Sequence, residues 1–260
     1  MIVVLICFSF YCASKLTGSK MLLKTLSDKK ECLNCSFRMT NCNLASASAG
    51  INNTKTMYIP QHYRNENLKE VREFIINNSF GILINQIEGK PWATHIPLEL
   101  DKNSNGNDIL CGHIAKANPQ WKYFNQGGEV LCVFNGPHSY VSSSWYAEEE
   151  VPTWNYVAVH VYGLLKIQDE SALMASLNKL VDKYEHKSEN PISLNELSAS
   201  TLRQVKGVVG FEIEIKEIQA AYKLSQGRED DHPKIIEELK KSDTCGGQAI
   251  AEAMKCKHLK

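Results

Sequence analysis

The chain has 260 residues, 43% of them hydrophobic and 22% charged, with a formal net charge of zero, and this length suits one large domain or two small ones with a well-filled core. The first 56 residues carry seven of the 29 Lys and Arg but only two of the 29 Asp and Glu, so the remainder is acidic by five charges. Binding of duplex DNA depends on neutralising its phosphates, so this balance counts against direct DNA binding.

Residues 1–56 form a leader with no clear fold pattern. Residues 2–12 are apolar but too few to span a bilayer as a helix, and they resemble a secretory signal without its positively charged start. Cys32, Cys35 and Cys42 offer three thiolates to zinc, but a fourth ligand at a sensible spacing is missing. We therefore expect no metal site here, and a poorly ordered or targeting segment whose targeting role the sequence leaves open.

From residue 57 onward, stretches of helical and of strand periodicity follow one another. Leu68, Val71 and Phe74 share one face of an expected helix, and Pro97 removes a ladder donor, which indicates a strand edge or a bulge. The expected elements of this half are a helix at 67–78, strands at 80–87 and 92–100, a polar loop at 101–108 and a strand at 109–115.

The second half is dominated by strand patterns. Its expected elements are strands at 130–135, 139–142, 154–167 and 207–220, a helix at 170–186, a helical stretch at 193–205, and short helices near 233–241 and 247–255. Many strands with few parallel crossovers predict a closed antiparallel β-barrel with flanking helices. We expect one mainly β (α+β) domain over residues 57–260, without membrane contact.

The strand at 109–115 runs into the sequence Gly112-His113-Ile114-Ala115-Lys116-Ala117-Asn118-Pro119-Gln120-Trp121. Asn118 is a good N-cap, and Pro119 fits the first position of a helix. The free N–H groups of that turn, the helix dipole and the Lys116 ammonium would then face one point, which predicts an anion site, most naturally for a phosphate. A surface lysine beside an ordinary helix cap is the alternative.

Four further segments accompany this motif: Met57-Tyr58-Ile59-Pro60, Trp92-Ala93-Thr94-His95-Ile96-Pro97-Leu98, Val151-Pro152-Thr153-Trp154-Asn155-Tyr156 and Lys223-Leu224-Ser225-Gln226. Together they resemble the PaiB-type FMN-binding family, whose members are labelled negative transcriptional regulators and are similar to the pyridoxamine-phosphate-oxidase-like split barrels. The resemblance runs from Met57 to about the C-terminus. It implies an FMN-binding split β-barrel with flanking helices, and a homodimer that holds FMN near the subunit interface.

The resemblance also implies which residues contact the cofactor. Lys116 and Asn118 are expected at the FMN phosphate. Thr94 and His95 lie on the strand that runs along the flavin ring in split barrels, although His95 suits an ordinary hydrogen-bonded barrel position equally well. His113 is a candidate for the phosphate or the ring, but strand alternation can turn it to the opposite face.

Candidate contacts to the flavin ring come from later in the chain. Trp154, and with less support Trp145, could stack on the isoalloxazine, with a core position as the alternative. Gln226 and Arg228 follow the last strand and are expected at the flavin, across the dimer. The family usually has Asn where this chain has Gly227, which leaves the local backbone open.

We therefore expect an FMN-binding protein of the PaiB-like transcriptional regulator family, with DNA binding implied only by the family label, since no helix-turn-helix pattern is evident. The alternative is an FMN-dependent oxidoreductase that uses a nicotinamide donor, because the cofactor carries such chemistry and catalytic residues need not be visible. A weaker alternative is a pocket adapted to haem or another flat ligand. His138 suits either a proton donor at the flavin or a structural hydrogen bond in a turn.

The cysteines of residues 57–260 show no disulfide framework. Cys111 and Cys132 lie inside apolar strand patterns and are expected to be buried, reduced thiols. We expect this domain in the cytoplasm.

Overall fold

The computed structural model describes residues 57–124 and 128–258, so the predictions for residues 1–56, including the zinc ligands, lie outside the described residues. Six antiparallel strands close into a barrel in the order β1-β2-β3-β6-β5-β4. The strands are β1 (Phe80–Ile87), β2 (Lys90–Lys102), β3 (Asp108–Ala115), β4 (Glu129–Val141), β5 (Thr153–Ile167) and β6 (Val208–Lys223). This architecture confirms the predicted mainly β barrel with flanking helices.

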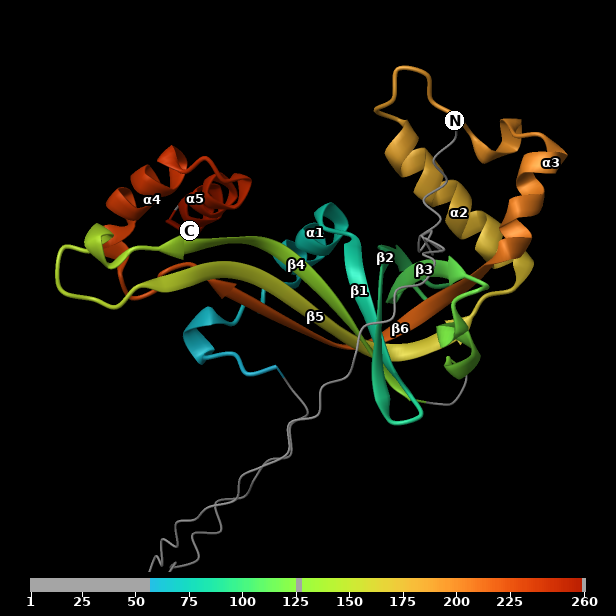
Figure 1. The fold of residues 1–260 in the computed structure, drawn as a ribbon, viewed down its shortest axis with the longest axis horizontal. Coiled ribbons are helices and arrows are strands. Elements are labelled where there is room, and N and C mark those ends of the chain that lie inside the picture. The colour runs from blue at the N-terminus through green and yellow to red at the C-terminus, as the bar shows by residue number, and fades with distance from the viewer. Residues whose placement is uncertain (1–56, 125–127, 259–260) are drawn as a thin grey trace, which may run out of the picture. The chain divides into compact units, whose positions relative to one another are not determined.

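The helices flank the barrel. They are α1 (Leu68–Asn77), α2 (Glu170–Glu185), α3 (Ala199–Leu202), α4 (His232–Lys241) and α5 (Cys245–His258). Figure 1 shows α2 and α3 together at one end, and α4 and α5 over the projecting ends of β4 and β5 at the other. The intervening 3₁₀ turns are η1 (Gln61–Tyr63), η2 (Pro119–Tyr123), η3 (Ser143–Trp145), η4 (Leu194–Glu196), η5 (Arg203–Gly207) and η6 (Glu229–Asp231). The helical stretch expected at 193–205 is therefore broken into η4, α3 and η5.

Strand β4 is continuous where the sequence predicts two strands separated by Gly136-Pro137. Its register against β5 shifts between Asn135 and His138, so a bulge takes up the proline, which cannot donate to the ladder. The prediction of two strands was wrong because β5 is unbroken on the opposite side and resumes pairing with β4 after the bulge.

Pro97 marks a change of strand partner. It pairs with Phe80 of β1, whereas the next residue, Leu98, pairs with Gly112 of β3. The N–H of Leu98 donates to the carbonyl of Ser79 over 2.8 Å. The missing donor of Pro97 therefore falls where β2 passes from one neighbour to the other, and the register shows no bulge there.

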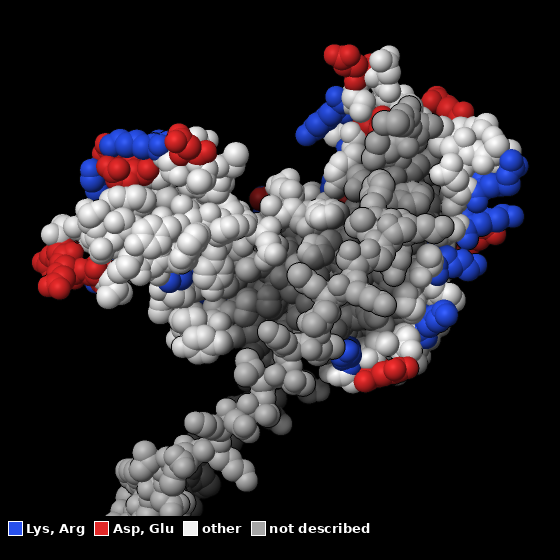
Figure 2. Space-filling model, viewed as in Figure 1, with Lys and Arg blue, Asp and Glu red and all other residues white. Residues whose placement is uncertain are grey.

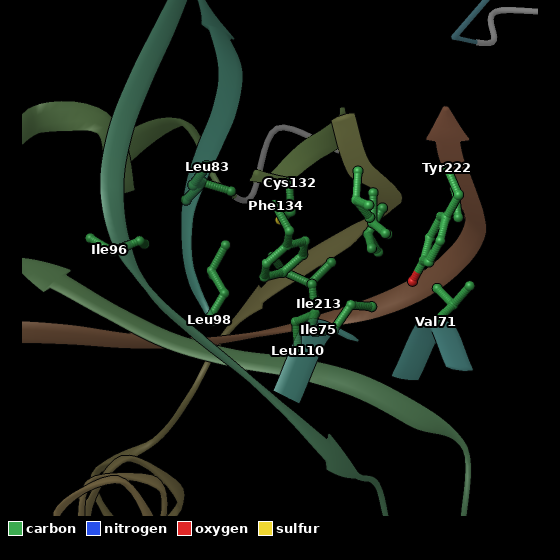
Figure 3. Packing of buried hydrophobic residues seen from close by; sticks show 14 of the residues in the cluster. Val71, Ile75, Leu83, Ile96, Leu98, Leu110, Cys132, Phe134, Ile213 and Tyr222 are labelled. Atoms are coloured by element: carbon green, nitrogen blue, oxygen red, sulfur yellow. The ribbon is translucent and has the colours of Figure 1, made fainter. Parts of the chain in front are cut away.

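The core fills the barrel from all sides. Val157, Val159 and Val161 of β5 point inward and are at most 4% exposed, as the alternating pattern predicts. Figure 3 shows side chains of the strands and of α1 converging, among them Leu98, Phe134 and Ile213. Helix α1 adds Val71 and Ile75 to this cluster, so it closes part of the core through its apolar face.

Both cysteines expected as buried thiols are buried and free. Burial, with the carboxylates of Asp101 and Glu212 nearby, raises the pKa of Cys111 to about 11. Burial raises the pKa of Cys132 as well. Because the thiolate is the reactive form, both cysteines are inert packing residues at neutral pH.

Within residues 57–124 and 128–258, none of the helices combines the length and the apolar character that crossing a bilayer requires. Over the same two stretches, no three His, Cys, Asp or Glu side chains are grouped as metal ligands would be.

We predict that Asn67→Ala destabilises the fold by about 1 kcal/mol, the usual cost of losing an N-cap. The Asn67 side-chain oxygen accepts from the N–H groups of Lys69 and Glu70 at the start of α1. Urea denaturation followed by circular dichroism measures the loss. The matched control is Asn105→Ala on an exposed loop, which we expect to stay within about 0.5 kcal/mol of the parent chain; an equal loss in both variants would contradict the capping role.

Candidate functional site

The predicted anion motif forms a short turn. Asn118 caps η2 as expected, and its side-chain oxygen accepts from the N–H of Gln120 over 3.0 Å. The expected helix, however, is a 3₁₀ turn of five residues, because the Asn-Gln-Gly-Gly sequence that follows Phe124 offers no apolar face to extend it. So short a turn contributes little dipole, which leaves Lys116 as the main positive group of the motif.

The backbone of Lys116 is held from two sides. Its N–H donates to the carbonyl of Gly207 over 2.7 Å, and its carbonyl accepts from the indole N–H of Trp121 over 2.9 Å. The side chain is exposed, and no described acidic residue forms an ion pair with it. The fold therefore presents a lysine with a fixed backbone and an uncompensated charge at the end of β3.

A polar network, buried at Gln120, connects η2 and its cap to the barrel strands. The Thr94 hydroxyl accepts from the Asn118 amide over 3.1 Å and donates to Gln120 Oε1 over 2.6 Å. Gln120 is fully buried, and its amide nitrogen donates to Asn85 Oδ1 over 3.0 Å. The network ties η2 to β1 and β2, and it brings Thr94, which was expected along the flavin ring, into contact with Asn118, which was expected at the phosphate.

Sequence reasoning missed Gln120. A glutamine in a polar turn carries no signal of burial, since hydrophobic periodicity is the signal that identifies core positions. Only its place two residues after the Asn118 cap could have drawn attention to it.

His95 and His113 do not join this turn. His95 is exposed on the outer face of β2, on the side opposite to Thr94. His113 also points out of the barrel, but toward α2, where it is only 8% exposed and lines a separate cavity. The alternation of β3 thus turns His113 to the face opposite to Leu110 and Ile114, as the sequence allowed.

Trp154 lies in a second region, at the projecting ends of β4 and β5. There it lines a cleft of about 690 Å³ together with Trp145, Tyr140 and His138. The Trp154 ring centroid is 6.0 Å from that of Tyr140 and 6.1 Å from that of His138. Lys241 of α4 lines the same cleft. The arrangement is an aromatic wall, with one cation beside it, open to a flat ligand.

Gln226 and Arg228 are engaged within the chain near this cleft. Gln226 accepts from the N–H of Leu224 over 2.8 Å and so closes its own turn. Arg228 forms an ion pair with Glu150, and its guanidinium carbon lies 5.9 Å from the Tyr146 ring centroid. Both side chains therefore shape the loops beside the cleft.

Gly227 has a φ of +81°. Glycine adopts this left-handed region freely, and Asn tolerates it better than most residues. The departure from the family's usual Asn therefore keeps a residue suited to this backbone.

One chain cannot bring these two regions together. Thr94 pairs with Leu83, which pairs with Cys132 of β4, whereas Tyr140 beside Trp154 lies eight residues farther along β4. At about 3.3 Å per residue, the two regions are roughly 25 Å apart along the strand. Lys116, Asn118 and η2, together called the Lys116 turn, and the Trp154 cleft are thus separate sites on a single copy.

Buried His113 and half-buried His160 predict a loss of stability in acid. Burial lowers the pKa of His113 and of His160, so protons bind the unfolded chain more readily, and stability falls as the pH drops below about 6.5, the ordinary histidine value. We expect His113→Gln to lose less unfolding free energy than the parent between about pH 7 and about pH 5, measured by urea denaturation. Exposed His62→Gln is the control; parallel pH profiles for all three chains would contradict the assignment.

Comparison with known proteins places residues 57–217 in a family described as "Putative FMN-binding domain". Protease synthase and sporulation protein PAI 2 of Bacillus subtilis is 43% identical over 203 residues, covering 77% of this chain and 98% of that protein. An uncharacterized protein of Emericella nidulans is 30% identical over 242 residues, covering 76% of this chain and 96% of that protein. Among solved structures, the FAD and heme binding protein from Mycobacterium smegmatis is 14% identical with a TM-score of 0.49, covering 62% of this chain and 73% of that chain.

Proposed function

Because this chain belongs to the FMN-binding domain family, as its five motifs predicted, we propose that two copies of it bind FMN at sites shared between them. Each site combines the Lys116 turn of one copy with the Trp154 cleft of its partner. The observation that carries this proposal is the separation of the two regions by roughly 25 Å within one chain.

The Lys116 turn suits the phosphate. A lysine ammonium gives a charge-assisted hydrogen bond to a phosphate oxygen, and this bond is stronger than a neutral one. Lys116 has a fixed backbone and no acidic partner among the described side chains. Asn118 and Thr94 complete a polar surface next to it.

The Trp154 cleft suits the ring system. Its volume of about 690 Å³ falls within the roughly 300–1,000 Å³ of small-molecule sites. Trp154 and Trp145 offer flat faces, and His138 offers a ring nitrogen beside them. FMN, when bound, supplies an electron-accepting ring, while the protein positions it and limits its contact with water.

The outer face of the barrel suits a second copy. Phe80, Tyr140 and Trp154 are 56%, 46% and 54% exposed and lie on the outward side of β1, β4 and β5. Figure 2 shows charged residues gathered on the outside of α4 and α5, with few on the white surface beneath. Large apolar side chains exposed on a surface with few charges are typical of interfaces between proteins.

The experiment is to titrate the purified full-length chain with FMN and follow flavin fluorescence, with sedimentation on the same samples. We expect a yellow dimer with about one FMN per chain. A protein that stays monomeric and changes no flavin signal would overturn the proposal.

The biological role that we propose is that of a PaiB-like regulator acting in the cytoplasm. The family supports this role, and the four cysteines within the described stretches are free thiols, as is usual in that compartment. Direct duplex binding gains no support from a domain that is acidic by five charges. Bleaching of the bound flavin by NADH or NADPH would instead favour the oxidoreductase alternative.

A further inference from the structure

A cavity of about 100 Å³ lies outside the proposed flavin site. It separates the outer face of β3 and β6 from α2 and from the segment that contains α3 and η5. Its walls include Leu177, Val181, Leu194, Val205 and Val208, all members of a second hydrophobic cluster distinct from the barrel core. This space is enclosed mainly by apolar side chains, so it favours a molecule with little charge.

His113 is the buried polar group in this wall. Its side chain is 8% exposed, and no hydrogen bond to its ring is found among the residues that the structure describes. Burial lowers its pKa, so the neutral ring has one donor and one acceptor available at neutral pH. A buried polar group without a partner is costly, and a ligand that supplies the missing hydrogen bond would recover part of that cost.

Of the other polar residues that line the cavity, Tyr184, Glu185 and Thr201 have hydrogen-bond partners within the chain, and Gln204 is exposed. The Tyr184 hydroxyl is bonded to Ser79 over 2.6 Å and donates to Glu99 over 2.9 Å. The Glu185 carboxylate accepts from the N–H of Ile192, and its charge opposes an anionic ligand. The recognition chemistry of the cavity is therefore one buried imidazole in a mainly apolar wall, with the exposed Gln204 amide as a second polar group.

We propose that this cavity binds a small, uncharged, mainly aliphatic alcohol whose hydroxyl group pairs with His113. The size argument is direct, because an apolar cavity of about 150 Å³ holds benzene in another protein, so the present cavity fits a short branched chain. The cavity is separate from the proposed FMN site, since its lining includes neither Lys116, Asn118 and Thr94 nor any residue of the Trp154 cleft.

The test uses 3-methylbutan-1-ol as the probe, with 2-methylbutane and 3-methylbutanoate as the uncharged apolar and the anionic comparisons. Histidine ring resonances of the full-length chain are followed by NMR, and His113→Leu identifies the His113 signal. We expect this signal to shift saturably with the alcohol. We expect His113→Leu to weaken alcohol binding about threefold to tenfold, the range of one neutral hydrogen bond, and to leave binding of 2-methylbutane unchanged.

Two controls keep the result decisive. His62→Leu removes an exposed histidine outside the cavity and is expected to bind the alcohol like the parent. Leu177→Phe narrows the cavity without touching His113 and is expected to abolish binding of both uncharged probes. If His113→Leu does not fold, the proposal is tested on the parent chain alone. The alcohol is then expected to raise its melting temperature more than 2-methylbutane does.

Equal binding of the alcohol by the parent and by His113→Leu would overturn the proposal, as would absence of a saturable shift in the parent or preference for 3-methylbutanoate. Flavin absorbance is recorded on the same samples. Failure of alcohol binding in a yellow protein therefore counts against this cavity alone.

Discussion

Mixing Lys116→Ala and Trp154→Ala chains restores tight FMN binding that neither variant has alone, if the site is shared between two copies. Each variant alone has the same defect in both sites of its dimer. Loss of a charge-assisted hydrogen bond costs about 1.5–3 kcal/mol, so Lys116→Ala weakens binding roughly 10- to 100-fold. Loss of the Trp154 face is expected to weaken it about tenfold.

The mixed dimer differs from both parents. One of its two sites combines both defects, while the other receives an intact Lys116 turn and an intact Trp154 cleft. After free subunit exchange in an equal mixture, about one site in four should bind FMN with parental affinity. The measurement is a flavin-fluorescence titration of the mixture, in which a tight fraction appears that neither separate variant shows.

Two outcomes would contradict the shared site. A mixture that binds like the average of its components, despite exchange verified by mass spectrometry, places both groups in one chain's site. Lys122→Ala, at an exposed lysine of η2 six residues after Lys116, is the matched control and should bind FMN like the parent. If it loses as much affinity as Lys116→Ala, the effect is one of general charge.

Gln120→Leu is expected to lower the free energy of unfolding by about 3 kcal/mol. The replacement puts an apolar side chain of similar size into a fully buried position. It removes the partner of the Thr94 hydroxyl and of the Asn85 side-chain oxygen. Each buried polar group left without a partner costs about 1–3 kcal/mol. Urea denaturation with a free fit of the slope measures the loss.

The control for this variant is Gln86→Leu, an exposed position on β1, where a change below about 0.5 kcal/mol is expected. A loss below 1 kcal/mol in Gln120→Leu, with an unchanged slope, would show that water or repacking satisfies Thr94 and Asn85. In that case the network does not hold the Lys116 turn in place.

Much of the fold is readable from local pattern. The alternation of β5 placed Val157, Val159 and Val161 inward, and the apolar face of α1 placed Val71 and Ile75 in the core. What local pattern could not give is pairing. The bulge that carries Pro137 through β4 depends on an uninterrupted β5 opposite, and the switch at Pro97 depends on which strands lie on either side.

In the candidate site, too, contacts between sequence neighbours were predictable, and contacts that depend on strand pairing were not. Lys116 and Asn118 are neighbours in sequence, so their proximity was predictable from the motif. Contact between Thr94 and Asn118 joins residues 24 positions apart, and Gln120 links them through a buried side chain that no periodicity marks. The roughly 25 Å that separates Thr94 from Trp154 follows from strand register, which residue spacing alone does not define.

The end of the chain belongs to the same cooperative structure as the barrel. Asn155 of β5 is fully buried and donates to Ser225 over 2.9 Å and to the sulfur of Met254 over 3.8 Å. Ile235 and Ile250 pack in the same core as Phe211, although the match to the family model ends at residue 217. The segment that the family model covers is therefore shorter than the unit that folds. A fragment that ends at residue 217 would lose residues 218–223 of β6 and the groups that cover Asn155. We therefore expect this fragment to be unstable when it is expressed.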